Sequence, residues 1–373
     1  MSERNRAVSR RSLLAAGGTV ASAVAMTGEP VALAATPASR HPGGGDAGRA
    51  RIDVHHHYTA PAWVDWAERA GLVRRAELPP FARWDAASTL ALMDRAGIAT
   101  AVLNPTSPGR YRSAAQAKEG LSVMYRALDE LVRAHPGRFA FVAPLFPEDL
   151  ALSRWSLRRG FDELGAVGVS LKANAGGVYL GDRSYDRLFA ELDERAAVVL
   201  THPLDLPGGR PDVPTVPGVP NFMCDFLLDT TRAAVNMIVH RTLDRFPRVS
   251  VVLPHAGGFL PHIATRLESQ GRMCTPPVEP ARVRDHLHRF CYDTAGPMSP
   301  AGTLVATVGA GRLLFGSDWP ATPPGVVTGV AVPGLDADPA LTHRQRRGVN
   351  RDNALRIMPR LARYVRPRGD RRR

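Results

Sequence analysis

Three consecutive histidines follow a short apolar run in the segment Arg51-Ile52-Asp53-Val54-His55-His56-His57. Because side chains alternate between the two faces of a β-strand, His55 and His57 share one face and His56 points to the other. Two imidazoles on one face at a strand end provide half of a metal site. The triplet alone is equally compatible with a histidine-rich surface loop, so the interpretation depends on whether other segments supply further ligands.

Three other apolar runs also end in a residue type that binds metals. They are Val198-Val199-Leu200-Thr201-His202, Val251-Val252-Leu253-Pro254-His255 and Phe315-Gly316-Ser317-Asp318. Taken singly, a histidine after a strand is more often structural, and an aspartate before Trp319-Pro320 also suits a turn. Four such strand ends together predict one metal site, and neutral imidazoles with a carboxylate suit zinc or another borderline divalent ion.

The elements that must position these residues alternate along the chain between β-rich runs and amphipathic helices. The predicted strands are 51–55, 98–103, 139–145, 167–172, 197–201, 249–254, 289–293 and 312–317. The predicted helices are 86–96, 114–134, 150–164, 185–195, 226–246, 260–270, 300–308 and 342–358. Eight strands, each followed by a helix, predict an α/β fold, a (β/α)8 TIM barrel in one domain over residues 51–365. A doubly wound sheet with fewer strands is the alternative.

Two inserts follow predicted strands at the end of the barrel where active sites lie. Residues 58–84 contain Trp63, Trp66 and Trp84, and residues 203–224 contain six prolines. Long loops at this end are candidate lids over a substrate. The alternative is a pair of rigid surface loops without a role in function.

The two ends of the chain differ from this body in composition. Residues 1–34 contain Arg10-Arg11 before a weakly apolar run and end in Ala32-Leu33-Ala34, which predicts a twin-arginine export signal. We therefore expect an exported protein, secreted or periplasmic in the cell envelope, without a stable membrane span after signal cleavage. The alternative is an arginine-rich leader. Residues 35–50 are a predicted linker, and residues 366–373 form a predicted basic disordered tail.

Charge and cysteine content exclude two classes of function. The formal net charge is +13, from 48 Lys and Arg against 35 Asp and Glu, but it is spread along the chain without a basic helix. This distribution argues against nucleic-acid binding. The three cysteines, Cys224, Cys274 and Cys291, lack the paired spacing of a thiolate metal site. We expect buried free thiols, and one disulfide is the alternative.

At these residues the chain resembles the amidohydrolase superfamily over roughly residues 51–360. More narrowly, it is similar to the decarboxylating branch that includes α-amino-β-carboxymuconate-ε-semialdehyde, γ-resorcylate and 6-methylsalicylate decarboxylases. Within this branch, its sequence motifs are most like those of the 6-methylsalicylate decarboxylases. The resemblance rests on Ile52-Asp53-Val54-His55-His56-His57, Thr201-His202-Pro203, Pro254-His255-Ala256-Gly257-Gly258, Leu314-Phe315-Gly316-Ser317-Asp318-Trp319-Pro320, Asn353-Ala354-Leu355-Arg356, Thr106-Ser107-Pro108-Gly109, Gly176-Gly177-Val178-Tyr179-Leu180-Gly181-Asp182 and Asp229-Thr230-Thr231-Arg232.

The resemblance implies a role for each of six residues. The implied ligands of one Zn²⁺ or Mn²⁺ per chain are His55, His57, His202 and Asp318. It also implies that His255 is the acid/base histidine beside the metal-bound water. His255, Asp318 or that water could supply the proton, and we favour a relay between His255 and Asp318. Arg266 matches an arginine that binds the substrate carboxylate from the neighbouring subunit, which implies a homodimer. Its alternative is a salt bridge on a helix surface. Arg74 and Arg75 do not match the family's second substrate arginine in spacing.

The implied activity is non-oxidative decarboxylation of a small aromatic or enoic carboxylic acid, such as a 6-methylsalicylate-like compound. The metal would bind the carboxylate or phenolate, and a proton would reach the ring carbon. A hydrolase of the lactonase or amidase type is the alternative, with a carboxylated Lys172 bridging two ions. The number of metal ions per chain distinguishes the two activities, because one ion supports the decarboxylase and two support the hydrolase. A non-catalytic binding protein on the same barrel is the third possibility, which a functional metal-free protein would favour.

Overall fold

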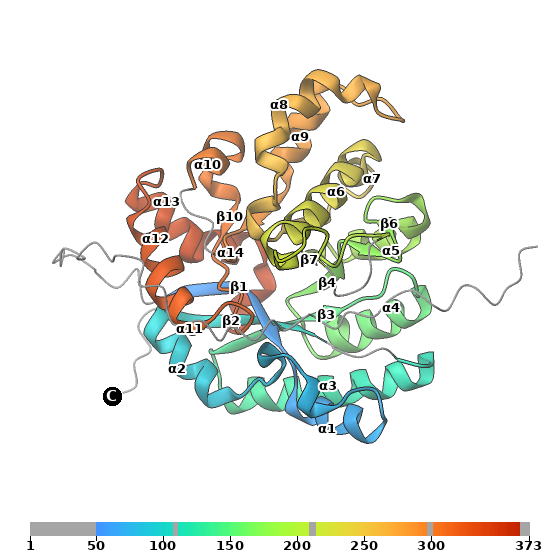
Figure 1. The fold of residues 1–373 in the computed structure, drawn as a ribbon, viewed down its shortest axis with the longest axis vertical. Coiled ribbons are helices and arrows are strands. Elements are labelled where there is room, and N and C mark those ends of the chain that lie inside the picture. Colours follow the sequence, from blue (N-terminus) through green and yellow to red (C-terminus); the bar gives the residue numbers. More distant parts are fainter. Residues whose placement is uncertain (1–49, 107–110, 209–213, 297–300, 366–373) are drawn as a thin grey trace, which may run out of the picture.

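The computed structural model describes residues 50–365 except 107–110, 209–213 and 297–300. The predicted export signal, nearly all of the linker, the basic tail and the beginning of the predicted helix 300–308 lie outside the described residues. Figure 1 shows the described chain as a ring of helices around a central sheet.

Eight parallel strands form the sheet, in the order β1-β2-β3-β4-β7-β8-β9-β10. Their bounds are β1 Arg51–Tyr58, β2 Ile98–Pro105, β3 Phe139–Pro144, β4 Gly168–Lys172, β7 Val198–His202, β8 Ser250–Leu253, β9 Cys291–Asp293 and β10 Leu313–Leu314. The segment after β10 pairs with β1, since Val54 N donates to Phe315 O at 2.9 Å and His57 N donates to Trp319 O at 2.7 Å. The sheet thereby closes, and the predicted (β/α)8 TIM barrel is confirmed.

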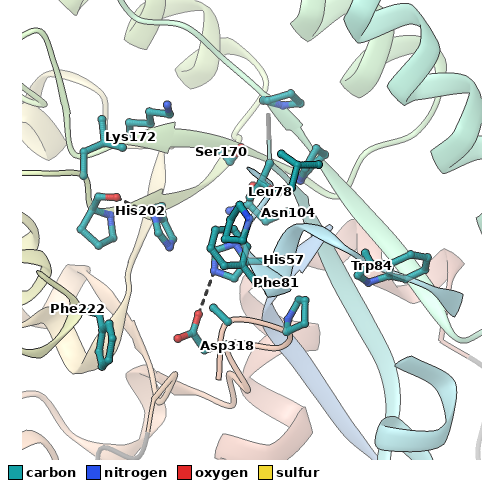
Figure 2. Close-up of a pocket in the computed structure, with 18 of the residues that line it drawn as sticks. His57, Leu78, Phe81, Trp84, Asn104, Ser170, Lys172, His202, Phe222 and Asp318 are labelled. Carbon is teal, nitrogen blue, oxygen red and sulfur yellow. Dashed lines mark hydrogen bonds and ion pairs between the residues drawn. The ribbon is translucent and has the colours of Figure 1, made fainter. Parts of the chain in front are cut away.

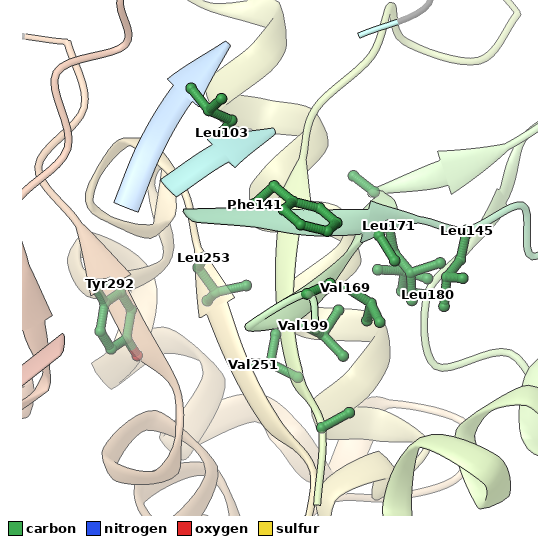
Figure 3. Packing of buried hydrophobic residues seen from close by; sticks show 14 of the residues in the cluster. Leu103, Phe141, Leu145, Val169, Leu171, Leu180, Val199, Val251, Leu253 and Tyr292 are labelled. Carbon is green, nitrogen blue, oxygen red and sulfur yellow. The ribbon is translucent and has the colours of Figure 1, made fainter. Parts of the chain in front are cut away.

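The strands are apolar along both faces because parallel strands of a barrel are buried on both sides. One set of side chains, which includes Leu103, Phe141, Val199 and Leu253, belongs to the large core shared with the helices (Figure 3). A second set fills the inside of the barrel, where Val198 and Leu200 alternate in phase with His202. The same alternation therefore builds the core and directs His202 to the barrel mouth.

A β-bulge in β1 changes which residues face the inside of the barrel. Ile52 is paired with Thr100 of β2, whereas His57 is paired with Asn104, and the register shifts between Asp53 and His56. The extra residue moves the inward-facing positions from Ile52 and Val54 to His55 and His57. Both histidines thus join the inner face of the barrel at its carboxyl end.

The helices surround the barrel and connect its strands. Their bounds are α1 Pro61–Arg69, α2 Ala86–Ala96, α3 Ala114–Ala134, α4 Leu150–Ser156, α5 Asp186–Glu194, α6 Asp225–Val239, α7 Thr242–Arg245, α8 Leu260–Gln270, α9 Pro280–Arg289, α10 Gly302–Val308, α11 Pro324–Val326, α12 Val332–Ala337, α13 His343–Arg347 and α14 Asn353–Ile357. A small hairpin, β5 Asn174–Ala175 and β6 Val178–Tyr179, lies between β4 and α5. The predicted bounds of 86–96, 114–134 and 260–270 are confirmed for α2, α3 and α8.

Other helix predictions were wrong or incomplete. The predicted helix 226–246 is broken into α6 and α7, because Arg241 has a left-handed backbone conformation with φ of 55°. Helices α1, α9, α11 and α12 were not predicted. Helix α1 begins at Pro61 and buries Trp63 and Trp66, so part of the first insert belongs to the core.

Among the described helices, none combines the length and apolar character needed to span a bilayer. The three cysteines are free, as predicted, and Cys291 is buried. The expectation of burial is wrong for Cys224, which is exposed, because it immediately precedes α6 at the end of the second insert.

Candidate metal centre

Four side chains converge at the carboxyl end of the barrel: His55, His57, His202 and Asp318. One potential ligand atom from each lies within 4.8 Å of the others. Figure 2 shows His57, His202 and Asp318 facing the same space. The histidines come from the ends of β1 and β7, and Asp318 comes from the segment after β10. The barrel therefore brings together the residues that the four strand ends supplied.

The Asp318 carboxylate is the centre of this cluster. Its Oδ1 lies 3.0 Å from His57 Nε2 and 3.2 Å from His55 Nε2. Asp318 has a left-handed φ of 60°, and Asp318 N donates to His55 O at 2.9 Å. Thr322 also donates from its hydroxyl to Asp318 Oδ2 at 3.2 Å. These bonds hold the carboxylate toward the imidazoles despite its strained backbone.

The Nδ1 atoms of two of the histidines already have hydrogen-bond partners. His55 Nδ1 is 2.8 Å from Asp293 Oδ2, and His202 Nδ1 is 2.8 Å from Pro203 O. Such partners fix the tautomer with Nε2 unprotonated, the form that binds a metal. His55 Nε2 is also buried without a hydrogen-bond partner. Three imidazoles and a carboxylate, with one such orphaned nitrogen, fit a divalent transition-metal ion such as zinc or manganese.

The electrostatics of the cluster agree with this fit. Burial lowers the pKa of His202 well below its usual value, and the neighbouring His57 and His55 lower it further. Burial also opposes ionisation of Asp318, but its interactions with the adjacent His55 and His57 imidazoles outweigh burial and hold its pKa well below the usual range. The pKa of His55 is raised, because Asp293 and Asp318 outweigh the effect of burial. The buried carboxylates thus stabilise positive charge at this point, and a bound cation would replace the proton on His55.

His255 lies beside the cluster. Its Nε2 is 3.9 Å from Asp318 Oδ2, and its backbone N donates to Asp293 Oδ1 at 2.9 Å. Burial lowers its pKa. The turn that carries it has positive φ from His255 through Gly258, and a Cβ on Gly258 would lie 2.2 Å from Leu227 O. The close approach of α6 therefore requires glycine there, and the turn aims His255 at the site.

Asp293 is a functional candidate that the sequence reasoning missed. It ends β9, is buried, and accepts hydrogen bonds from the backbone N atoms of His255 and Ala295 as well as contacting His55. The one signal in the sequence was a carboxylate at the end of the seventh predicted strand. Its partners come from other strands, so the strand pattern alone did not identify its contacts.

His56 points away from the cluster, as strand alternation predicted. Its Nδ1 is 2.9 Å from Asp53 Oδ2. The Asp53 carboxylate also accepts from the backbone N of His55 and from both the backbone N and the hydroxyl of Ser317. Asp53 thereby ties β1 to the segment that carries Asp318.

A cavity of about 2210 Å³ opens above the cluster. Both inserts contribute apolar walls, with Leu78, Phe81 and Trp84 from the first and Phe222 and Met223 from the second. Trp63 and Trp66 do not line it, because both are packed in the core. Described residues of both inserts therefore line the cavity, and Trp84 is the one of the three tryptophans that does so.

The other predicted residues differ in their distance from this cavity. Lys172 lines it at the end of β4, where it is paired in register with His202. Arg266 is exposed on α8 and is absent from the cavity lining, so within one chain it does not reach the site. Its contact with a neighbouring subunit stays a prediction. Arg74 borders the cavity but is paired with Glu77.

A closed (β/α)8 barrel with clustered histidine and aspartate side chains at its strand ends is the architecture of the metal-dependent hydrolase class. The chain belongs to the amidohydrolase family, whose model matches residues 52–360. It is 32% identical over 293 residues to decarboxylase macB of Penicillium terrestre, which covers 73% of this chain and 85% of that protein. It is 29% identical over 330 residues to 6-methylsalicylic acid decarboxylase acuB of Aspergillus aculeatus, which covers 84% of this chain and 97% of that protein.

The fold is also found in solved structures. One is 5-carboxyvanillate decarboxylase LigW2 of Novosphingobium aromaticivorans, crystallised with bound manganese and 3-methoxy-4-hydroxy-5-nitrobenzoic acid. It has a TM-score of 0.70 and 20% sequence identity, and the match covers 85% of this chain and 99% of that chain. At this identity the likeness supports the fold.

Proposed function

We propose that this protein is a metal-dependent decarboxylase that removes CO₂ from a small aromatic carboxylic acid, such as a 6-methylsalicylate-like compound. The observation that carries the proposal is the four-residue ligand cluster with His255 beside it, in a family whose similar members are named decarboxylases. The aromatic and apolar walls of the cavity suit a flat ring.

In this proposal His55, His57, His202 and Asp318 hold one divalent ion per chain, zinc or manganese. When bound, such an ion supplies Lewis acidity toward the carboxylate or an adjacent phenolate of the substrate. The manganese in the 5-carboxyvanillate decarboxylase supports a divalent ion of this kind. The choice between zinc and manganese is part of the test below.

The protein's own residues then supply a proton and aromatic surface for the ring. A proton must reach the ring carbon that bears the carboxylate, so that a carbon–hydrogen bond forms as the bond to CO₂ breaks and its electron pair stays with the ring. We assign this proton to His255, with Asp318 as its relay partner. Their separation of 3.9 Å is longer than a hydrogen bond, and catalytic contacts of this kind commonly tighten when substrate binds. Phe81 and Phe222 line the cavity and provide aromatic surface for the ring.

We also propose a homodimer in which Arg266 of one subunit binds the substrate carboxylate in the other. Its exposure on α8, outside the cavity of its own chain, supports this arrangement. Measurement of the solution mass and of the KM of an Arg266→Ala variant tests it. A monomer with unchanged KM would contradict it.

The proposed location is the cell envelope or the medium, reached through a twin-arginine signal in residues 1–34. The paired Arg10-Arg11 supports this route. Replacing both with lysine in a reporter fusion should block export, and unimpaired export of that variant would contradict the proposal.

Hydrolysis at two metal ions is a second candidate function because of one observation. Lys172 lies at the mouth of the barrel on the strand next to that of His202, where a carboxylated lysine could bridge two ions. One ion per chain supports the decarboxylase, and two ions that fall to one in Lys172→Ala support the hydrolase.

The decisive experiment incubates metal-quantified protein with salicylates, resorcylates and lactones. Release of CO₂ and ring opening are followed separately, with zinc-loaded and manganese-loaded protein compared. Release of CO₂ from an aromatic acid supports the proposal. Lactone opening without CO₂ release would contradict it.

A further inference from the structure

The peptide group between Pro203 and Leu204 lies between two side chains that it connects. On one side, His202 Nδ1 is 2.8 Å from Pro203 O. On the other side, Leu204 N donates to Asp229 Oδ2 at 2.8 Å. A trans peptide is planar, and its C=O and N–H point in opposite directions. Whatever holds the N–H therefore determines where the carbonyl points.

Asp229 is well placed to hold this peptide. It lies on α6 and is fully buried, and its other oxygen, Oδ1, accepts from Asn174 Nδ2 at 2.9 Å. Asn174 follows Ala173, whose backbone N donates to His202 O at 2.8 Å. Both oxygens of the carboxylate thus contact segments that adjoin the main chain of His202.

The placement of a carboxylate here is costly unless it performs a specific task. Burying an ionisable group disfavours its charged form, and an apolar residue at this position of α6 would avoid that cost. Asp225, one turn earlier on the same helix, is also buried, but it accepts from the backbone N and hydroxyl of Thr215 instead. The two acids therefore hold different parts of the second insert.

We propose that Asp229 is a positioning residue for the metal centre, which keeps the Pro203 carbonyl on His202 Nδ1 and so leaves His202 Nε2 free for the ion. The inference rests on the metal centre of the proposed function. The hydrogen bond from Leu204 N to the Asp229 carboxylate also polarises the peptide group. The Pro203 carbonyl therefore becomes a stronger acceptor for His202 Nδ1. Partners in this outer layer commonly change metal affinity by about 10- to 100-fold.

The test measures the affinity of the metal-stripped full chain for Mn²⁺ and for Zn²⁺ by competition with a chelator. Asp229→Ala should weaken binding by about 10- to 100-fold. Asp229→Asn should recover most of the loss, because its amide oxygen still accepts from Leu204 N. Asn174→Ala removes the hydrogen bond to Asp229 Oδ1, leaves the bond to Leu204 N in place, and should bind the ion nearly as wild type does. Asp225→Asn is the matched control on the same helix, with no loss expected.

A second measurement covers the case in which Asp229→Ala does not fold. In protein labelled with ¹⁵N-histidine, the ring shifts of His202 report its tautomer, and a His202→Gln variant identifies the resonances. Wild-type metal-free protein should carry the proton on Nδ1, and Asp229→Asn should keep that tautomer. Replacing Leu204 with proline deletes the donated N–H and should produce a mixture of tautomers.

Wild-type affinity in a folded Asp229→Ala, or an unchanged tautomer in Leu204→Pro, overturns the inference. A loss of affinity in Asn174→Ala as large as in Asp229→Ala also overturns it, because the effect would then be a general loosening of the core. Neither readout needs a substrate. If the wild type binds the ion but releases no CO₂, the proposed decarboxylation fails while this inference is judged separately.

Discussion

One carboxylate joins the candidate metal ligand His55 to the backbone of His255: Asp293 Oδ2 lies 2.8 Å from His55 Nδ1, and Asp293 Oδ1 accepts from His255 N at 2.9 Å. The two histidines come from β1 and from the turn after β8, and β9 supplies the carboxylate. Because Asp293 contacts both, a change at this residue should affect metal binding and catalysis together.

We expect Asp293→Ala to bind Mn²⁺ or Zn²⁺ about 10- to 100-fold more weakly, since it removes the partner that orients His55. Metal content after dialysis against a chelator measures the loss. Asp352→Ala removes an exposed carboxylate paired with Arg347 and serves as the control. Full metal content in Asp293→Ala would show that His55 is held by its strand alone.

Removal of the metal should abolish CO₂ release, and addition of zinc or manganese should restore it. His57→Ala and His202→Ala should prevent this recovery, because each deletes one of the four clustered ligand atoms. Metal analysis and assay of the same samples provide the check. Full turnover by chelator-treated protein with no bound ion would contradict a metal-dependent reaction.

His255→Ala should retain its metal and lose turnover by about 10²- to 10⁴-fold, the range expected for an acid/base residue. His255 is not one of the four clustered ligands, which is why metal content should stay near wild type. Turnover and metal content are measured on one preparation. Near-normal turnover would rule out its assigned role.

Gly316→Ala should destabilise the fold by about 1–3 kcal/mol, because the added Cβ overpacks the place where the segment after β10 meets β1 and closes the barrel. That Cβ would lie 2.8 Å from the Cβ of His55 and 3.2 Å from that of Ala295. Gly311→Ala is the control, since a Cβ there meets open space. The free energy of unfolding in urea is the measurement, and equal values for the two variants would refute the steric argument.

A buried histidine outside the site should contribute to acid lability. Burial lowers the pKa of His286 below its ordinary value of 6.5. The unfolded chain then binds the proton more readily, so stability should fall as the pH drops from about 6.5 through the pKa of the folded state. His286→Gln should show a shallower decline in melting temperature over this range. Parallel curves for the two proteins would contradict the prediction.

The residues of the candidate site were recognisable in the sequence because their signals are local. An apolar run followed by histidine or aspartate marks a strand end, and parallel strands of a barrel bring these ends to one rim. Helix α2 was equally predictable, since Asp85 accepts from Ser88 N at its start and Gly97 has a left-handed φ of 68° at its end. Such features depend on residues that are neighbours in the chain.

Features that depend on partners distant in sequence became visible in the tertiary structure. Asp293 contacts a residue 238 positions away, and Asp229 contacts Leu204 across 25 positions. The core packing of Trp63 and Trp66 likewise depends on neighbours brought together by folding.

For the histidine triplet, alternation within the chain separated His56 from His55 and His57. The sequence by itself determined that division, because the period of a strand is a local property. The bulge in β1 decided that His55 and His57, rather than His56, face the inside of the barrel. That choice belongs to the tertiary structure, since it depends on the register with β2 and on the hydrogen bonds that Ser317 donates to Asp53.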